Sequence, residues 1–424
     1  MQNAVATNPV SRIRYIITVI PILALEYGLA LFGRSQLIGA KSVVFREMNP
    51  LSTKLLYFLI SLMIFGCVAW IGWLSARRSR TIRSDTVFAS FAVVPWLQLL
   101  VIPILAFAKE QSKSDKEEST LIPLRGALWG LGIALAAEVV FTLLLGDFGI
   151  ALFVGSPFVV GLVTAYFSIR EGHSHPIWAG QLALLLASLV LFGFAYEGLF
   201  CLILAYPLAA IAAMVGGGIG IALARMQASR TTALSSVAIL PLLLMLEVTV
   251  PPNLEFTDVH SIDVDAPPAA VWGSIVHMGR IMDQPSAPFG WGLAYPIDGR
   301  IDGQGIGAVR MGVFSTGIAY ERVTRWESER ELWFDVLTDP PMMQETNPFG
   351  PVNSEHLVGY FATRDARFSL RPLANGYTRL TLVTDHRLSI GPSSYFAPLA
   401  RWAVSANKQR VLNHFRNQAE QSKR

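Results

Sequence analysis

The last stretch of the chain carries polar side chains in an otherwise apolar helical pattern. Between residues 393 and 421, Asn407 and His414 interrupt a stripe of apolar residues spaced three and four positions apart. Residues at this spacing lie on one face of a helix. Because buried polar groups need partners, we expect these two side chains either to bind the polar end of a ligand or to bond to strand backbone. Trp402, from the same helix, is a further predicted ligand contact.

Three other side chains are suited to acid–base or electrostatic work. Glu345 and His356 lie in the stretch 338–361, which is rich in proline and methionine and long for a connection between strands. Long connections are often functional, and this one is predicted to be an apolar lid whose carboxylate and imidazole orient a ligand. Such a pair can also act as general acid and base. Arg310, on a predicted strand, is a candidate cation for an anionic head group, with an exposed strand arginine as the alternative.

Two carboxylates lie well inside apolar runs. Glu26 and Glu138 are each placed where a membrane helix is expected. A charged side chain at the centre of such a helix costs about 2.5–3.5 kcal/mol on insertion scales. We therefore expect these two side chains to be buried in pairs or to line a pathway. Small residues at every fourth position, Ala212, Gly216 and Gly220, predict close helix packing.

The composition predicts an integral membrane protein. Of the 424 residues, 52% are hydrophobic and 15% are charged, whereas soluble domains carry about a quarter charged residues. A membrane helix needs about 20 mostly apolar residues. We expect eight such helices, at roughly 15–33, 55–75, 87–108, 123–145, 149–168, 178–196, 199–224 and 232–250.

Charge and cysteine content exclude several classes of function. The net charge of +4 comes from lysines and arginines that flank the apolar runs, so no nucleic-acid partner is predicted. The two cysteines lie inside apolar runs, which excludes a disulfide framework or a Cys/His metal site, and no cofactor is expected. The bias of basic residues toward the cytoplasm favours an extracytoplasmic carboxy-terminal part at a bacterial plasma membrane, although the RRSRTIR cluster at 77–83 favours the opposite side.

After residue 252 the long apolar runs end, and the residue pattern becomes that of a folded α+β domain. The stretch IDVDAPPAAVW at 262–272 alternates like a strand and then opens a helix with two prolines. Further strands are predicted at 305–314, 317–327, 331–338, 358–373 and 377–388, followed by the long terminal helix; 283–305 is expected to be a loop.

This order of elements resembles the START-like, polyketide cyclase and lipid-transport (SRPBCC) superfamily over about 253–424. The resemblance rests on IDVDAPPAAVW together with the strand meander and the closing helix. It implies a helix-grip fold, in which a curved antiparallel sheet surrounds a long carboxy-terminal helix. It also implies an apolar cavity for lipids, sterols, polyketides or similar molecules, and no universal catalytic residue. The predicted architecture is a polytopic helical membrane domain, 1–252, followed by this hydrophobic-ligand-binding domain, 253–424.

Three hypotheses for function follow. The first is a membrane-anchored binding module that takes a lipid or other hydrophobic small molecule to or from the bilayer, with membrane lipids as partners. The second is a membrane-tethered cyclase or hydrolase in which Glu345, His356 and His414 supply acid and base. The third is a sensor in which ligand binding changes the membrane helices.

Overall fold

The computed structural model describes two compact units. It covers residues 10–38, 50–82, 89–95, 97–108, 124–145, 148–173, 175–226, 238–285, 287–345, 347–348, 352, 359–374 and 376–422. Contacts assign Met1–Val248 and Asn347–Val352 to the first unit, and Thr249–Thr346 and Asn353–Arg424 to the second. Each unit is described by itself below.

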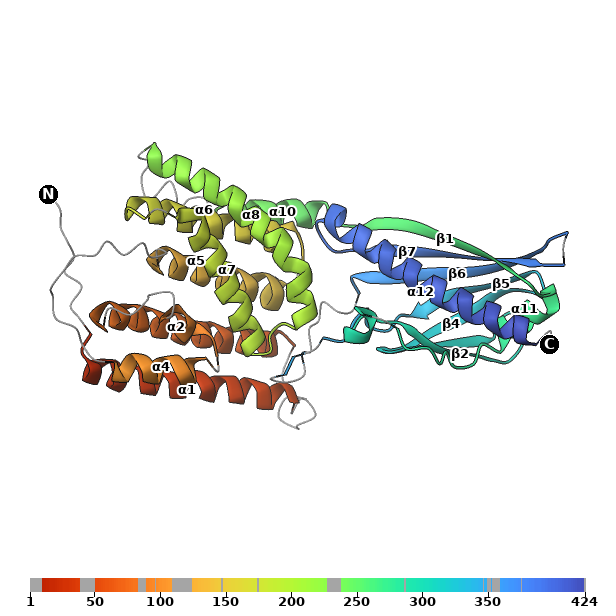
Figure 1. Cartoon of the computed structure of the whole chain (residues 1–424), viewed down its shortest axis with the longest axis horizontal. Helices are drawn as coiled ribbons and strands as arrows, with labels where there is room; N and C mark the ends of the chain where they lie inside the picture. Colours follow the sequence, from red (N-terminus) through yellow and green to blue (C-terminus); the bar gives the residue numbers. More distant parts are fainter. Residues whose placement is uncertain are drawn as a thin grey trace. The chain divides into compact units, whose positions relative to one another are not determined.

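The first unit is built from apolar helices (Figure 1). They are α1 (Arg12–Ile38), α2 (Pro50–Ile82), α4 (Gln98–Phe107), α5 (Leu124–Glu138), α6 (Ser156–Arg170), α7 (Pro176–Gly193), α8 (Leu199–Arg225) and α10 (Ile239–Thr249). A 3-10 turn, η2 (Phe91–Val93), precedes α4, and the π-helical turns η3 (Val139–Leu145) and η4 (Ala151–Gly155) lie between α5 and α6.

Within the described residues, five helices are long and apolar enough to cross a membrane. They are Arg12–Phe32, Phe58–Ser79, Ala151–Arg170, Pro176–Gly193 and Leu199–Arg225. The other three predicted spans form shorter apolar helices, Gln98–Phe107, Gly126–Thr142 and Ile239–Thr249. The run at 87–108 is broken between Val93 and Gln98, where Pro95 removes a backbone donor that a continuous helix needs. The predicted count of eight spans is therefore replaced by five candidates.

The two membrane carboxylates have different surroundings. Glu26 on α1 is fully buried, and its Oε1 accepts a hydrogen bond of 2.9 Å from Nε2 of Gln98 on α4. Glu138 is the last residue of α5, is partly buried, and offers its backbone carbonyl to the Thr142 hydroxyl at 2.6 Å. The expected polar pairing is thus present at Glu26, with a neutral amide as partner.

Small residues bring α6 and α8 into close contact. A Cβ added at Gly216 would lie 2.0 Å from the Phe158 carbonyl oxygen, and one at Gly220 would lie 2.2 Å from that of Leu162. On the other helix, a Cβ at Gly161 would meet the Ala213 carbonyl oxygen at 2.0 Å. The backbones therefore touch directly, as the four-residue spacing of small residues predicts.

Gly216→Val is expected to lower the thermal stability of the detergent-solubilised protein, because the added side chain must push α8 away from α6. Overpacking of this kind costs about 1–3 kcal/mol. Gly218→Val is the matched control, since an added Cβ there meets nothing within 4 Å. Thermal denaturation of both variants measures the difference, and equal midpoints would contradict the close packing.

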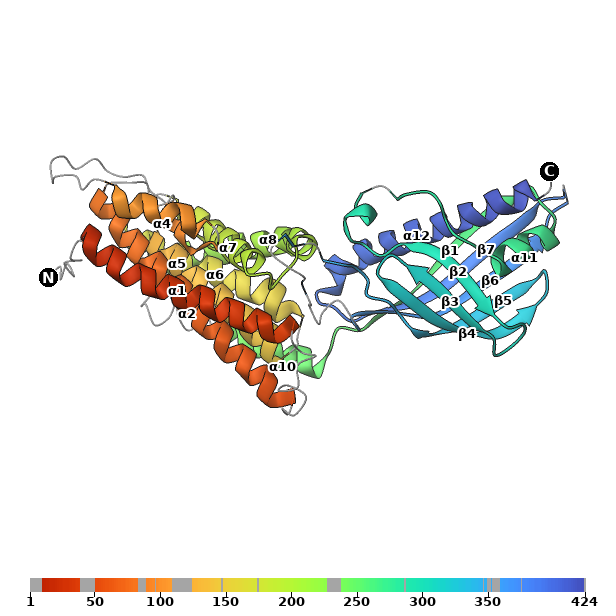
Figure 2. The ribbon, with the colours of Figure 1, turned by 90° about the horizontal axis from the view of Figure 1, so that it is seen from below.

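The second unit is a seven-stranded antiparallel sheet with a long helix against it (Figure 2). Its strands are β1 (Leu254–Val264), β2 (Pro296–Asp302), β3 (Val309–Phe314), β4 (Gly317–Glu327), β5 (Glu331–Thr338), β6 (Phe361–Pro372) and β7 (Thr378–Leu388), in the order β1-β7-β6-β5-β4-β3-β2. A short helix, α11 (Pro268–Val276), follows β1, and α12 (Ser393–Gln421) closes the chain. The predicted helix-grip arrangement of sheet and terminal helix is present.

One strand lies where a loop was predicted. β2 falls inside 283–305, and its sequence PIDGRID is poor in strand-forming residues. It forms because it pairs with β3, with Gly299 directly opposite Gly312. Long-range pairing therefore outweighs weak intrinsic strand propensity.

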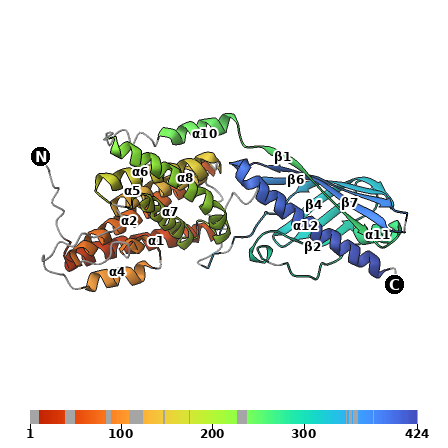
Figure 3. The ribbon, with the colours of Figure 1, turned by 45° about the horizontal axis from the view of Figure 1, so that its top comes forward.

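The domain's main core lies between α12 and the sheet (Figure 3). Leu412 and Phe415 of α12 are fully buried, and the Phe415 ring meets that of Phe368 on β6 at 5.7 Å. The buried face of α12 differs slightly from the predicted stripe, because Asn407 and His414 are not among its fully buried residues. The buried residues of the helix are Ala397, Ala400, Ala403, Lys408, Leu412, Phe415 and Ala419. A lysine thus occupies a position on the inner face of the helix.

Candidate ligand cavity

A cavity of about 190 Å³ lies between α12 and the sheet, inside the second unit. Its walls include four phenylalanines, from β3, β5 and β6: Phe314, Phe334, Phe361 and Phe368. Small residues stand where further large side chains would close the space: Gly312, Ala319, Ala366 and Ala403. Since interiors normally pack without voids, this combination of small residues facing α12 keeps the cavity open.

A buried ion pair forms one side of the cavity. Arg310 on β3 and Glu321 on β4 are register neighbours, and Nη1 of the arginine donates to Oε2 of the glutamate. Their side chains are 11% and 8% exposed, so the pair is largely removed from water. Room for the guanidinium comes from Gly299, where a Cβ would lie 3.2 Å from Nη2 of Arg310. The Arg310 guanidinium also lies 5.0 Å from the Phe334 ring centroid.

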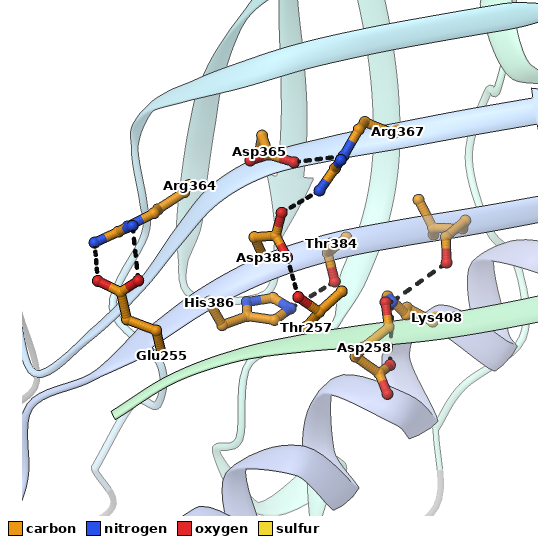
Figure 4. A network of polar contacts seen from close by, with 11 residues as sticks. Glu255, Thr257, Asp258, Arg364, Asp365, Arg367, Thr384, Asp385, His386 and Lys408 are labelled. Carbon is orange, nitrogen blue, oxygen red and sulfur yellow. Dashed lines mark hydrogen bonds and ion pairs between the residues drawn. The ribbon is translucent and has the colours of Figure 1, made fainter. Parts of the chain in front are cut away.

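A histidine and a threonine of β7 form the opposite side (Figure 4). The two side chains are joined by a hydrogen bond of 2.6 Å between Nε2 of His386 and Oγ1 of Thr384. The imidazole packs against the rings of both Phe256 and Phe361, with centroid distances of 5.2 and 5.1 Å, and these two rings also contact each other at 6.5 Å. Burial, assisted by the positive charge of Lys408, lowers the pKa of His386 to about 4. The imidazole is therefore neutral at physiological pH.

Lys408 reaches from α12 to β1 at the edge of the cavity (Figure 4). Its Nζ lies 3.1 Å from Oδ2 of Asp258 and also donates to the backbone carbonyl of Asp258. A longer hydrogen bond of 3.4 Å runs to the Leu382 carbonyl. Burial lowers the pKa of this lysine, while the contact with Asp258 stabilises its charged form.

Two long connections meet beside the cavity. Backbone hydrogen bonds join Ala294 to Met342 at 2.8 Å and Gln344 to Gly292 at 2.7 Å. Met342, with the two prolines before it, lines the cavity, as expected for a lid. Asp339, at the start of this stretch, accepts a hydrogen bond of 2.8 Å from the Thr363 backbone N–H.

The pH dependence of stability is expected to report on Asp339. Burial, with a smaller contribution from the charge of Glu321, raises its pKa from 3.8 to about 6. Because the folded state keeps this proton to a higher pH than the unfolded chain, the contribution of Asp339 to the free energy of unfolding falls as pH rises from about 4 to about 6. Each pKa unit corresponds to about 1.4 kcal/mol, so the loss is at most about 3 kcal/mol.

Asp339→Asn removes this proton, so the decline with rising pH should be missing from the variant. His386 acts in the opposite sense, because its contribution is lost as pH falls from 6.5 to about 4. The informative quantity is therefore the difference between the wild type and Asp339→Asn. Urea titrations followed by proteolysis of the domain, repeated across this range, measure it. A difference that does not change with pH would rule out a raised pKa at Asp339.

The predicted ligand contacts are distributed unevenly around this cavity. Arg310 and Asn407 line it, and Nδ2 of Asn407 donates to the Ala294 carbonyl at 2.9 Å. Trp402 is 49% exposed and its ring lies 5.5 Å from that of Phe289, outside the lining. His414 bonds to the Met278 carbonyl at 2.7 Å through Nε2, in the connection between α11 and β2 and not on a strand.

Of the two lid residues proposed as an acid–base pair, the structure describes Glu345. Glu345 is buried but does not belong to the lining. His356 lies outside the described residues.

The polar side chains of the lining include several that the sequence interpretation missed. They are Glu321, Asp339, Thr384, His386 and Lys408. A signal existed for three of them. The burial of β7 alternates from Thr378 to Leu388, which places Thr384 and His386 on the inner face, and Glu321 shares the inner face of β4 with Ala319 and Val323.

Comparisons with known proteins found matches among solved structures alone. No family model and no curated protein matches the chain. Among solved structures, truncated norcoclaurine synthase from Thalictrum flavum is 10% identical, covering 39% of this chain and 93% of its own, with a TM-score of 0.25. Ara h 8.0201 is 11% identical (40% and 99% covered, TM-score 0.26). An uncharacterised protein from Rhizobium leguminosarum is 10% identical (41% and 99%, TM-score 0.27).

Proposed function

We propose that the carboxy-terminal domain binds a hydrophobic small molecule in the cavity beneath α12 and exchanges it with a membrane that the apolar helices cross. The observation that carries this proposal is the cavity itself, whose walls are mostly apolar and whose cationic side chains are paired with carboxylates. Cavities of this composition are typical of small-molecule sites.

The size of the cavity limits the ligand. Drug-sized ligands occupy pockets of about 300–1,000 Å³, whereas an apolar cavity of about 150 Å³ is large enough for benzene. A volume of about 190 Å³ therefore suits one ring or a short chain. A larger lipid would place only one part of its structure inside.

Covalent attachment to membrane helices favours such a function. Residues 250–253 connect α10 to β1, so a short linker joins the domain to the apolar unit that holds the candidate membrane spans. Tethering through a short linker gives effective concentrations of about millimolar order. Exchange then needs no diffusion of the ligand through water.

Organic extraction of the purified full-length protein, followed by mass spectrometry, tests the proposal. We expect a discrete small hydrophobic species that is enriched over the bulk lipids of the same preparation. An extract that contains the membrane lipids in their bulk proportions, and nothing else, would count against a ligand-binding domain.

A further inference from the structure

One buried polar atom of the cavity lining has no partner. His386 is 5% exposed, and its Nε2 is engaged by Thr384 at 2.6 Å, but Nδ1 has no hydrogen-bond partner among the described residues. An unsatisfied buried polar group costs about 1–3 kcal/mol. Nδ1 itself is buried, so a ligand atom reaches it when the imidazole turns toward the cavity that His386 borders. A ligand atom that then bonds to Nδ1 would remove this cost, which suits the imidazole to anchor the polar end of a molecule in the cavity.

The charges around the cavity argue against an anionic ligand. Among the described lining residues, Arg310 and Lys408 carry positive charge, and each already faces a carboxylate. Arg310 is paired with Glu321, and Nζ of Lys408 lies 3.1 Å from Asp258. A ligand carboxylate would therefore lose its hydration without gaining an unpaired cation, which is strongly unfavourable in an apolar site.

The protonation state of the histidine leads to the same conclusion. Burial and the charge of Lys408 lower the pKa of His386 to about 4, so the imidazole offers no positive charge near neutral pH. A neutral imidazole has one donor and one acceptor nitrogen, and which of them is Nδ1 depends on the direction of the bond to Thr384. A hydroxyl group can donate or accept, so it satisfies Nδ1 in either tautomer.

We propose that the cavity selects an uncharged hydrophobic alcohol, whose hydroxyl group bonds to Nδ1 of His386 while its apolar body lies among the phenylalanines. This inference rests on the proposed function, and it specifies the chemical class of the ligand. His386 is then the residue that distinguishes an alcohol from a hydrocarbon, and the paired state of Arg310 and Lys408 excludes the corresponding carboxylate.

Photolabelling of the full-length protein in lipid nanodiscs tests this assignment. The probes are dodecanol, dodecanoate and dodecane, each with a diazirine close to one end of the chain, which is the head-group end in the alcohol and the carboxylate. The cavity of about 190 Å³ encloses only a short part of each chain. Labelling of cavity peptides is divided by labelling of α7 and α8 with the same probe, which corrects for partition into the bilayer. In the wild type, we expect dodecanol to label the cavity at least five times more than dodecanoate.

His386→Phe keeps a ring packed against Phe256 and Phe361 but removes Nδ1. We expect it to reduce cavity labelling by dodecanol about five- to tenfold, which corresponds to the loss of about one hydrogen bond, and to leave labelling by dodecane unchanged. His260→Phe is the matched control, because His260 bonds to Ser405 and lies outside the lining. Retained dodecane labelling also verifies that the variant is folded.

The possible outcomes distinguish the selection of an alcohol from the more general proposal that the cavity binds a hydrophobic small molecule. If dodecanoate labels the wild-type cavity as strongly as dodecanol, or if His386→Phe labels like the wild type, selection of an alcohol by His386 is overturned while the binding function stands. If none of the probes, dodecane included, labels the cavity peptides, both proposals fail.

Discussion

Replacement of Arg310 by methionine is expected to lower the free energy of unfolding of the carboxy-terminal domain by about 3–5 kcal/mol. The reason is the buried carboxylate that remains: the Glu321 side chain is 8% exposed, and removal of one member of a buried ion pair leaves an uncompensated charge. Replacement of both members by apolar residues is often neutral or stabilising. The double variant Arg310→Met/Glu321→Met should therefore recover most of the loss.

Urea titration of the full-length protein, with proteolysis of the carboxy-terminal domain as the readout, measures these changes. Arg300→Met is the matched control. That arginine is also on the sheet and lies 3.3 Å from Asp298, but its side chain is 74% exposed, and exposed ion pairs contribute about 0–1 kcal/mol. If Arg310→Met cost no more than Arg300→Met, the pair would have to be solvated, and the argument against an anionic ligand would lose one of its supports.

The alternation of apolar and polar residues accounts for the success of the strand predictions. β3 to β7 each bury one face, and a half-buried strand shows this directly in its sequence. β2 has no such signal, because its inner position at Gly299 carries no side chain. Its pairing with β3 depends on residues far along the chain from it, which a local pattern does not contain.

The cavity was harder to predict than the sheet around it. Alternation places Thr384 and His386 on the inner face of β7, but it does not distinguish an inner residue that borders a cavity from one that is packed in the core. That distinction depends on the small size of Ala366 and Ala403 on neighbouring elements. Arg310 could be predicted as a cavity residue because an arginine is unusual on a half-buried strand. Lys408 could not, because α12 carries several other charged residues and the sequence does not show which of them is buried.

Hydropathy located the apolar segments of the first unit, and five of the eight form helices that are long and apolar enough to span a membrane within the described residues. The run at 87–108 is apolar throughout, yet its helix begins at Gln98 and has ten residues. Hydropathy averages over a window, so a single proline that interrupts the backbone hydrogen bonds changes it little. Hydropathy therefore predicts that a segment is apolar, but it does not predict whether that segment forms one continuous helix.

Filling the cavity is expected to abolish ligand binding without unfolding the domain. Ala403 lies on α12, is 8% exposed and borders the cavity, so the indole of Ala403→Trp would occupy much of the space of about 190 Å³. Overpacking costs about 1–3 kcal/mol in a filled core, and less where a cavity receives the new side chain. We expect cavity labelling by dodecane and by dodecanol to fall more than tenfold in this variant.

Asn417→Trp is the control for the introduction of a tryptophan on the same helix, because Asn417 is exposed and does not border the cavity. It should label like the wild type with both photoreactive probes. His386→Phe should differ from both, since it loses dodecanol alone. If Ala403→Trp retained the labelling of the wild type, the ligand would have to bind elsewhere, because an indole and an apolar chain cannot share so small a volume in a close-packed interior.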